Sequence, residues 1–236
     1  MSRHLSNAIG KLKNKIIALA GLVETRVHLA VKSLEELNEK TAQEIIDSDM
    51  EIDQVEVEIE EECLKILALH QPVAIDLRII ISALKINIDL ERIGDLAVNI
   101  AERTLFLCNK PPIKLLFDFA EIRQKSLSML KDSLDSLMRL DADLAKKVRN
   151  SDDEVDQINR QMYIYVGTEG KKTPDQIDSL LSYLSVSRHL ERVADYATNI
   201  AEDVIYLVEG TIVRHRPTFP EDQIKHHLNP ASDKKI

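Results

Sequence analysis

Aromatic residues, glycine, proline and cysteine are all scarce in this chain of 236 residues. Phe, Trp and Tyr together make up 4% of it, Trp is absent, and there are only 6 Gly and 7 Pro. Helical bundles fill their cores with Leu, Ile, Val and Ala, whereas β-sheets favour aromatic and β-branched residues. The composition therefore predicts an all-α protein, and the scarcity of helix breakers predicts long helices with short connections.

Other absences bear on the compartment. Cys63 and Cys108 form neither a CxxC pair nor a zinc-binding pattern, which favours a reducing environment. The first twenty residues lack the apolar core of a signal peptide, and no apolar run approaches the ~20 residues that span a bilayer. We therefore expect a cytoplasmic protein that reaches the inner membrane only through partners.

Charge and motifs restrict the class of function. The net charge of -9 disfavours nucleic acid and anionic lipid, and it suits cations or basic protein surfaces. We find no glycine-rich phosphate loop, no GxSxG and no HExxH, so we expect no enzymatic activity. No histidine lies three residues after a glutamate, which argues against a ferritin-like di-iron core.

The apolar periodicity predicts two sets of three helices. The stripe in the third helix recurs in alternating steps of four and three, as in a coiled coil. It consists of Ile79, Ala83, Ile86, Leu90, Ile93, Ala97 and Ile100. The predicted helices span Leu5–Asn38, Thr41–Leu69 and Val73–Leu107, then Leu115–Leu140, Ala142–Val166 and Pro174–Glu209.

Breakers and capping residues divide the chain. Two prolines at 111–112 interrupt the pattern, so we predict one three-helix bundle in residues 1–108 and a second in 113–210. Thr173 is predicted to open the last helix with a capping box, and Gly210 to end it. Residues 211–236 have no apolar period and are predicted to be a mobile tail.

The two halves repeat one another. LKINIDLERIGDLAVNIAE begins at Leu84, and LSVSRHLERVADYATNIAE begins 100 residues later, at Leu184. One helix earlier, SDMEIDQV from Ser48 matches SDDEVDQI from Ser151. Such self-similarity is typical of a duplicated unit, and it predicts the same bundle twice.

The repeated motifs carry oxygen donors. On the third helix of each half, four of them fall within an arc of roughly 80° at 100° per residue, and carboxylates on the second helix also share a face. Stacked carboxylates repel one another, and a hard cation such as Mg, Mn, Ca or Fe would reverse that cost. The candidate ligands are Asp49, Asp53, Glu91, Asp95, Asn99, Glu102, Asp152, Asp156, Glu191, Asp195, Asn199 and Glu202.

A plainer interpretation of the same donors stays open. The acidic arc of the third helix lies roughly opposite the apolar stripe and should face outward. An outward acidic stripe on a helix is usually only solvated. The recurrence of the same donors in both halves favours a cation site, but it does not exclude a solvated surface.

The motifs resemble those of the PhoU family of bacterial phosphate-uptake regulators. The resemblance rests on QPVAIDLR from Gln71, LERIGDLAVNIAE from Leu90, LERVADYATNIAEDVIYLVEG from Leu190 and SDMEIDQVEVEIEE from Ser48. It runs from about residue 5 to residue 210. It implies two three-helix bundles side by side.

The resemblance also implies a function. Family members repress phosphate uptake and the phosphate-starvation response, and they are thought to link the ATPase subunit of the phosphate ABC transporter to a PhoR-type sensor histidine kinase. Some bind multinuclear iron or other metal clusters through surface E/DxxxD motifs, which Asp49–Asp53, Glu91–Asp95, Asp152–Asp156 and Glu191–Asp195 match. We therefore expect iron, manganese or magnesium, these two partners and a homodimer.

One departure and two other functions stay open. Asn159 and Tyr163 stand in the second half where Glu56 and Glu60 stand in the first, so the second site should be weaker or hold a different number of metal ions. A bundle whose function is to buffer metal is one alternative function. A hydrolase that uses a carboxylate metal cluster is the other.

Overall fold

The computed structural model describes residues 3–214, and every regular element in that range is helical. The first half contains α1 (Arg3–Glu36), α2 (Glu39–Asp47), α3 (Met50–His70) and α4 (Ala74–Cys108). The second half contains α5 (Phe119–Arg139), α6 (Ala142–Asn150), α7 (Asp152–Lys172), a 3-10 turn η1 (Pro174–Gln176) and α8 (Ile177–Glu209). The predicted all-α class is confirmed.

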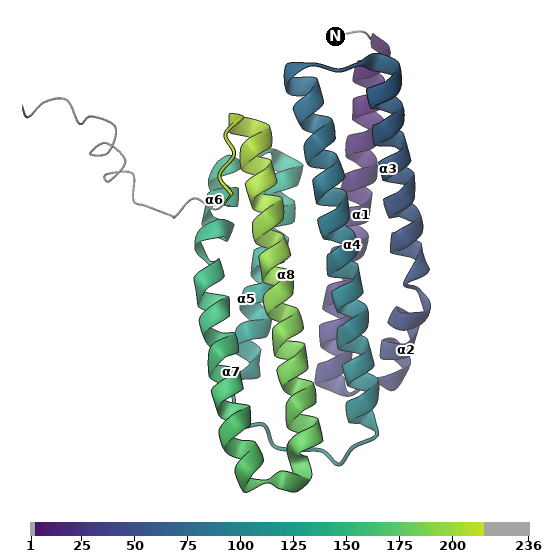
Figure 1. Cartoon of the computed structure of the whole chain (residues 1–236). Helices are drawn as coiled ribbons and strands as arrows, with labels where there is room; N and C mark the ends of the chain where they lie inside the picture. The colour runs from purple at the N-terminus through teal and green to yellow at the C-terminus, as the bar shows by residue number, and fades with distance from the viewer. Residues whose placement is uncertain (1–2, 215–236) are drawn as a thin grey trace, which may run out of the picture.

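The two halves stand side by side (Figure 1). α4 and α8 run antiparallel along the middle, with α1 to α3 on one side and α5 to α7 on the other. Each half is thus a bundle of three long helical segments, and the two bundles meet where α4 packs on α8.

The core explains this arrangement. Leu90 and Ile93 of α4 are fully buried, as are Leu190 and Val193 at the equivalent places of α8. Burying one such side chain is worth about 1.5–3 kcal/mol before conformational entropy is counted. The main apolar cluster continues from α1 to α8, so the bundles share their core instead of merely touching.

The structure corrects the second helix of each half. We predicted one continuous helix, but α2 ends before α3 begins and α6 ends before α7 begins. Ser48 donates its hydroxyl proton to the carbonyl of Ile45 at 3.1 Å, and Ser151 donates to the carbonyl of Lys147 at 3.1 Å. Such local hydrogen bonds compete with helix propagation, which accounts for a break at the same place in both halves.

Helix ends were predicted with mixed success. The prolines do end the first half, but α5 begins at Phe119 instead of Leu115, with Asp118 accepting a hydrogen bond from the N–H of Ala120 at 3.2 Å. The capping box at Thr173 is wrong, because its hydroxyl donates to the carbonyl of Glu169 at 3.0 Å and a 3-10 turn follows. The stop at Gly210 is confirmed by its left-handed φ of 73°.

The predicted mobile tail lies almost entirely outside the described residues. Only residues 211–214 of it are described, and they contact α6 and α8. None of the helices in residues 3–214 is both long and apolar enough to cross a membrane.

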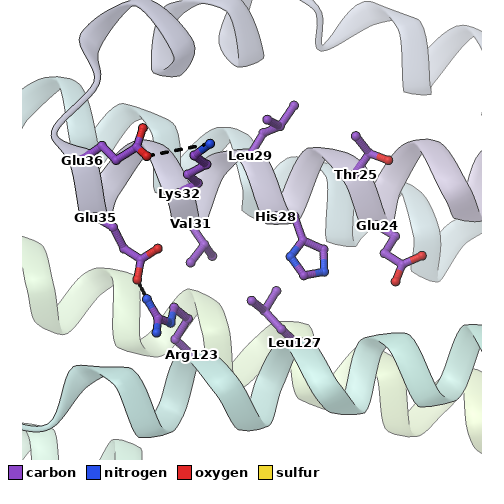
Figure 2. A pocket seen from close by; sticks show the side chains of 10 residues that line it. All are labelled: Glu24, Thr25, His28, Leu29, Val31, Lys32, Glu35, Glu36, Arg123 and Leu127. Atoms are coloured by element: carbon purple, nitrogen blue, oxygen red, sulfur yellow. Dashed lines mark ion pairs between the residues drawn. The ribbon is translucent and has the colours of Figure 1, made fainter.

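A groove of about 660 Å³ runs between α1 and α5 (Figure 2). Arg123 of α5 and Glu35 of α1 form an ion pair across it, so the groove also marks a contact between the halves. Its lining mixes both charges with apolar side chains, and none of the candidate ligands belongs to it. Its lining residues are Glu24, Thr25, His28, Leu29, Val31, Lys32, Glu35, Glu36, Arg123 and Leu127.

Candidate metal centres on the two bundles

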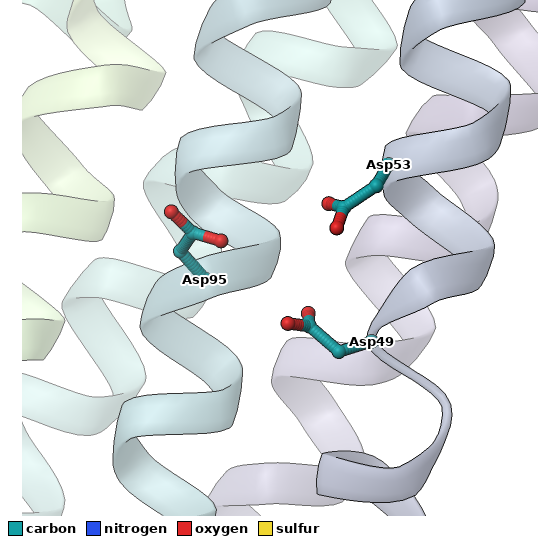
Figure 3. Close-up of side chains that lie close together, drawn as sticks. All are labelled: Asp49, Asp53 and Asp95. Atoms are coloured by element: carbon teal, nitrogen blue, oxygen red, sulfur yellow. The ribbon is translucent and has the colours of Figure 1, made fainter.

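Three predicted ligands meet in the first half. Asp49 and Asp53 stand at the start of α3, directly after the helix break, and Asp95 reaches toward them from α4 (Figure 3). One carboxylate oxygen from each lies within 4.8 Å of the others, the only such grouping of possible metal-binding side chains found in residues 3–214. The positive end of the α3 dipole favours negative charge at this place.

The pKa values show how these carboxylates disturb one another. Burial, followed by the charges of Asp53 and Asp95, raises the pKa of Asp49, while Arg26 lowers it. Burial also raises the pKa of Asp95, with Arg92 opposing and Asp53 adding to the increase. A hard cation would replace this repulsion by attraction, so the donor set fits Mg, Mn or Fe.

Two glutamates extend the acidic surface between α3 and α4. The pKa of Glu91 is raised by burial first and by Asp95 next. Asn87 donates its amide protons to the backbone carbonyl of Glu56 at 2.9 Å and to its carboxylate at 3.0 Å. Asn87 thereby fixes Glu56, whose pKa burial also raises, and sequence reasoning overlooked this asparagine.

Arginines border the cluster. Arg26 of α1 is 5% exposed and donates to the carboxylate of Glu51 at 3.0 Å, while its Nη1 has no hydrogen-bond partner among the described residues. In the sequence, Arg26 stands on an otherwise apolar face of its helix. That position was the one signal that could have predicted a buried arginine beside the acidic cluster. Arg92 of α4 forms ion pairs with Glu91 at 3.5 Å and with Asp95 at 3.8 Å.

The second half brings its four carboxylates near one another but less tightly. Burial first, then the charges of Glu191, Asp152 and Asp156, raise the pKa of Asp195 to about 7. Asp152 accepts a hydrogen bond from Thr198 at 3.1 Å, and Asp156 is 3.6 Å from the guanidinium of Arg160. These partners compete with a cation, consistent with a weaker second site.

The C-terminal donors of each arc point elsewhere. Asn99 donates to the backbone carbonyl of Asp95 at 2.8 Å, and Asn199 hydrogen-bonds to the carboxylate of Asp89. Glu102 lies 3.8 Å from Arg103, and its side chain is half exposed. Glu202 is only 11% exposed and pairs with Arg149 at 3.1 Å. The geometry therefore favours the first two acidic residues of each arc as ligands.

The arc is also less outward than the sequence indicates. Glu91, Asp95 and Asn99 are half-buried, because α3 covers one edge of their face. A fully solvated stripe would leave the carboxyl groups of Glu91 and Asp95 with ordinary pKa values. The crowding between α3 and α4 instead raises the pKa values of Glu91 and Asp95.

A duplicated bundle of three long helical segments, with an acidic cluster on each copy, defines a class of helical repeat proteins. The PhoU domain model matches the chain twice, at residues 16–104 and 119–204. The chain therefore belongs to the PhoU domain family.

Relatives agree over nearly the whole chain. It is 40% identical over 216 residues to the phosphate-specific transport system accessory protein PhoU homolog of Pseudomonas putida, covering 91% of this chain and 84% of that protein. The homolog of Aquifex aeolicus is 40% identical over 212 residues, covering 90% and 96%. The crystal structure of PhoU from Pseudomonas aeruginosa matches with a TM-score of 0.83 and 39% identity, covering 87% of this chain and 99% of that one.

Proposed function

We propose that this protein is a non-enzymatic accessory regulator of phosphate transport. It represses phosphate uptake and the phosphate-starvation response when phosphate is plentiful. It does so by linking the ATPase subunit of a phosphate ABC transporter to a sensor histidine kinase. The observation that carries the proposal is the match along 91% of the chain to a protein named as a phosphate-specific transport system accessory protein.

The acidic clusters supply a docking surface for such partners. A protein that joins two others needs exposed groups that each can read, and the two clusters are copies of one charged feature on separate bundles. Charge-lined interfaces give specificity and fast association more than raw affinity. We expect salt-sensitive binding in the micromolar range, either to basic residues directly or through bound cations.

Charge reversal tests the proposal. Asp95→Lys with Asp195→Lys should weaken binding to the purified ATPase or kinase at least tenfold while the helical signal persists, because the apolar stripes face the core. The same double variant should leave starvation genes active in rich phosphate. A matched control is Glu36→Lys with Asp143→Lys, which makes the same charge change at side chains 52% and 94% exposed that belong to neither cluster. Unchanged binding in the first variant would remove the acidic surfaces from the proposal.

Metal buffering remains a second candidate function, favoured by the proximity of Asp49, Asp53 and Asp95. A buffer must take up metal stoichiometrically with no partner present, and its deletion must change metal tolerance before it changes phosphate uptake. Metal tolerance and phosphate uptake should therefore be measured in the same deletion strain. An early change in metal tolerance favours buffering, and an early change in phosphate uptake favours regulation.

Location and assembly belong to the proposal as well. We infer a cytoplasmic homodimer that reaches the membrane only through the transporter. Sedimentation of the purified chain, and fractionation of cells with and without the transporter, test these two points.

A further inference from the structure

Two acidic side chains are buried between the bundles, outside the acidic clusters. Asp89 of α4 is 9% exposed and Asp203 of α8 is 2% exposed. Burial raises the pKa of both carboxyl groups, and the charge of Asp203 raises the pKa of Asp89 further. Two carboxylates in an interface of otherwise apolar character require balancing charge, because a buried unpaired charge is costly.

Two cations provide that balance, and they come from different parts of the chain. Lys85 of α4 lies 3.3 Å from one oxygen of Asp203, and its ammonium group also stands 5.6 Å above the ring of Tyr206. Arg214 lies 3.0 Å from the other oxygen of Asp203 and 3.9 Å from Glu202. Asp203 is thus held from α4 on one side and from beyond the end of α8 on the other.

The chain turns back to bring Arg214 there. Gly210, with its left-handed φ of 73°, ends α8 and reverses the direction of the backbone. Arg149 of α6 then donates to the carbonyl of Val213 at 3.3 Å. We call residues 210–214 the strap.

The repeat shows that the fold itself does not need this acidic pair. The positions equivalent to Asp89 and Asp203, 100 residues along or back, are His189 and Arg103, which face one another at the opposite end of the same interface. Only the end of the interface with Asp89 and Asp203 therefore carries two buried acidic groups. Their negative charge has to be balanced by Lys85 of α4 and by Arg214 of the strap.

We propose that the strap is a conformational latch, in which Arg214 holds the two bundles together by completing the charge balance of the buried Asp89–Asp203 pair. Whatever draws the strap away from α8 leaves one buried carboxylate uncompensated and loosens α4 from α8. The relative position of the two acidic clusters is thereby tied to the root of the C-terminal segment.

The full-length chain tests the latch. Arg214→Ala should lower the melting temperature by roughly 5 °C, given the cost of unpairing a partly buried ion pair. It should also raise hydrogen exchange in α4 around Asp89 and in α8 around Asp203. Adding Asp203→Asn removes the uncompensated charge. It should restore most of the melting temperature and most of the protection from hydrogen exchange in α4 and α8. Arg139→Ala, which removes a surface arginine 68% exposed, is the matched control and should change neither.

A distance measurement separates a latch from local stabilisation. Spin labels at Val57→Cys of α3 and Ile164→Cys of α7 report the spacing of the bundles, with Cys108→Ser removing the accessible thiol. Arg214→Ala should broaden the distance distribution, and the double variant with Asp203→Asn should narrow it again. If Arg214→Ala changes exchange only in residues 210–214 and leaves the label distances unchanged, the latch is wrong. It is equally wrong if the double variant is no more stable than Arg214→Ala.

Discussion

Gly94 of α4 lies directly against Ile52 of α3, so that a Cβ placed on Gly94 would come within 2.9 Å of the Cδ1 atom of Ile52. The equivalent residues of the second half are Ala194 and Val155, both buried. The larger residue at the α4 position is matched by a smaller one on the neighbouring helix. The same helix contact is therefore filled by a small and a large side chain in the first bundle, and by two side chains of intermediate size in the second.

This contact predicts a non-additive pair of substitutions. Gly94→Ala adds a methyl group to a packed site, which costs about 1–3 kcal/mol and is partly offset by the ~1 kcal/mol that alanine gains over glycine in a helix. Ile52→Val alone should cost about 0.5–1.5 kcal/mol. The double variant should lose less free energy of unfolding, measured with urea, than the sum of the losses in the two single variants. Simple additivity would show that the terminal methyl of Ile52 moves aside at no cost.

The order of apolar and polar residues along the chain was enough to predict which face of each long helix is buried. The stripe through Leu90 is buried as expected, because its period of alternating four and three residues leaves no other face for the core. The duplicated bundle could also be predicted, because the same motifs recur 100 residues apart in the sequence. The break at Ser48 was missed, because Ile45 and Ile52 on either side are both buried and hide the interruption.

Features that depend on the rotation of one helix against another could not be predicted. Asp49, Asp53 and Asp95 were all expected as ligands, but only the packing of α3 on α4 shows that their oxygens approach one another. Glu202 was expected as a ligand too, and its partner Arg149 lies 53 residues away in sequence. Pairings at such separations leave no local signal.

Metal binding in the first half should depend on Asp95. Glu91→Gln with Asp95→Asn removes two negative charges and keeps the side-chain shapes, so the free energy of unfolding without metal should rise or stay level as repulsion is relieved. Binding of Mn²⁺ to the first half, measured by calorimetry, should be lost, while the second half still binds. Asp143→Asn, at a site 94% exposed, is the control. Unchanged stoichiometry in the double variant would favour the solvated surface.

The second half should bind the same cation more weakly. Asn159 replaces the carboxylate of Glu56, and it accepts a hydrogen bond from Ser187 at 2.9 Å, so it is held away from the acidic residues. Thr198 also occupies one oxygen of Asp152. Thr198→Ala should free that oxygen and raise the affinity of the second site severalfold, with no effect on the first. Equal affinities in the unaltered protein would contradict this account.

The stability of the metal-free protein should depend on pH through Asp195. Its pKa is raised from 3.8 to about 7 by burial and by neighbouring carboxylates, so the folded state binds the proton more tightly than the unfolded chain does. The stability that this proton contributes is fully present below the unfolded pKa and is lost as pH rises through 7. The pKa of Asp89 is also raised to about 7 and acts in the same direction.

Thermal unfolding between pH 6.5 and 8.5, with chelator present, measures this effect. The melting temperature should fall as pH rises, and Asp195→Asn should make the fall smaller without removing the part due to Asp89. His189, whose pKa burial lowers to about 4, has an unfolded pKa near 6.5 and opposes the trend only at more acidic pH, which is why the window begins there. Saturating Mn²⁺ should flatten the curve, because a bound cation favours the ionised carboxylate. If Asp195→Asn follows the same curve as the unaltered protein, Asp195 is already ionised at neutral pH and the crowding inferred for the second cluster is wrong.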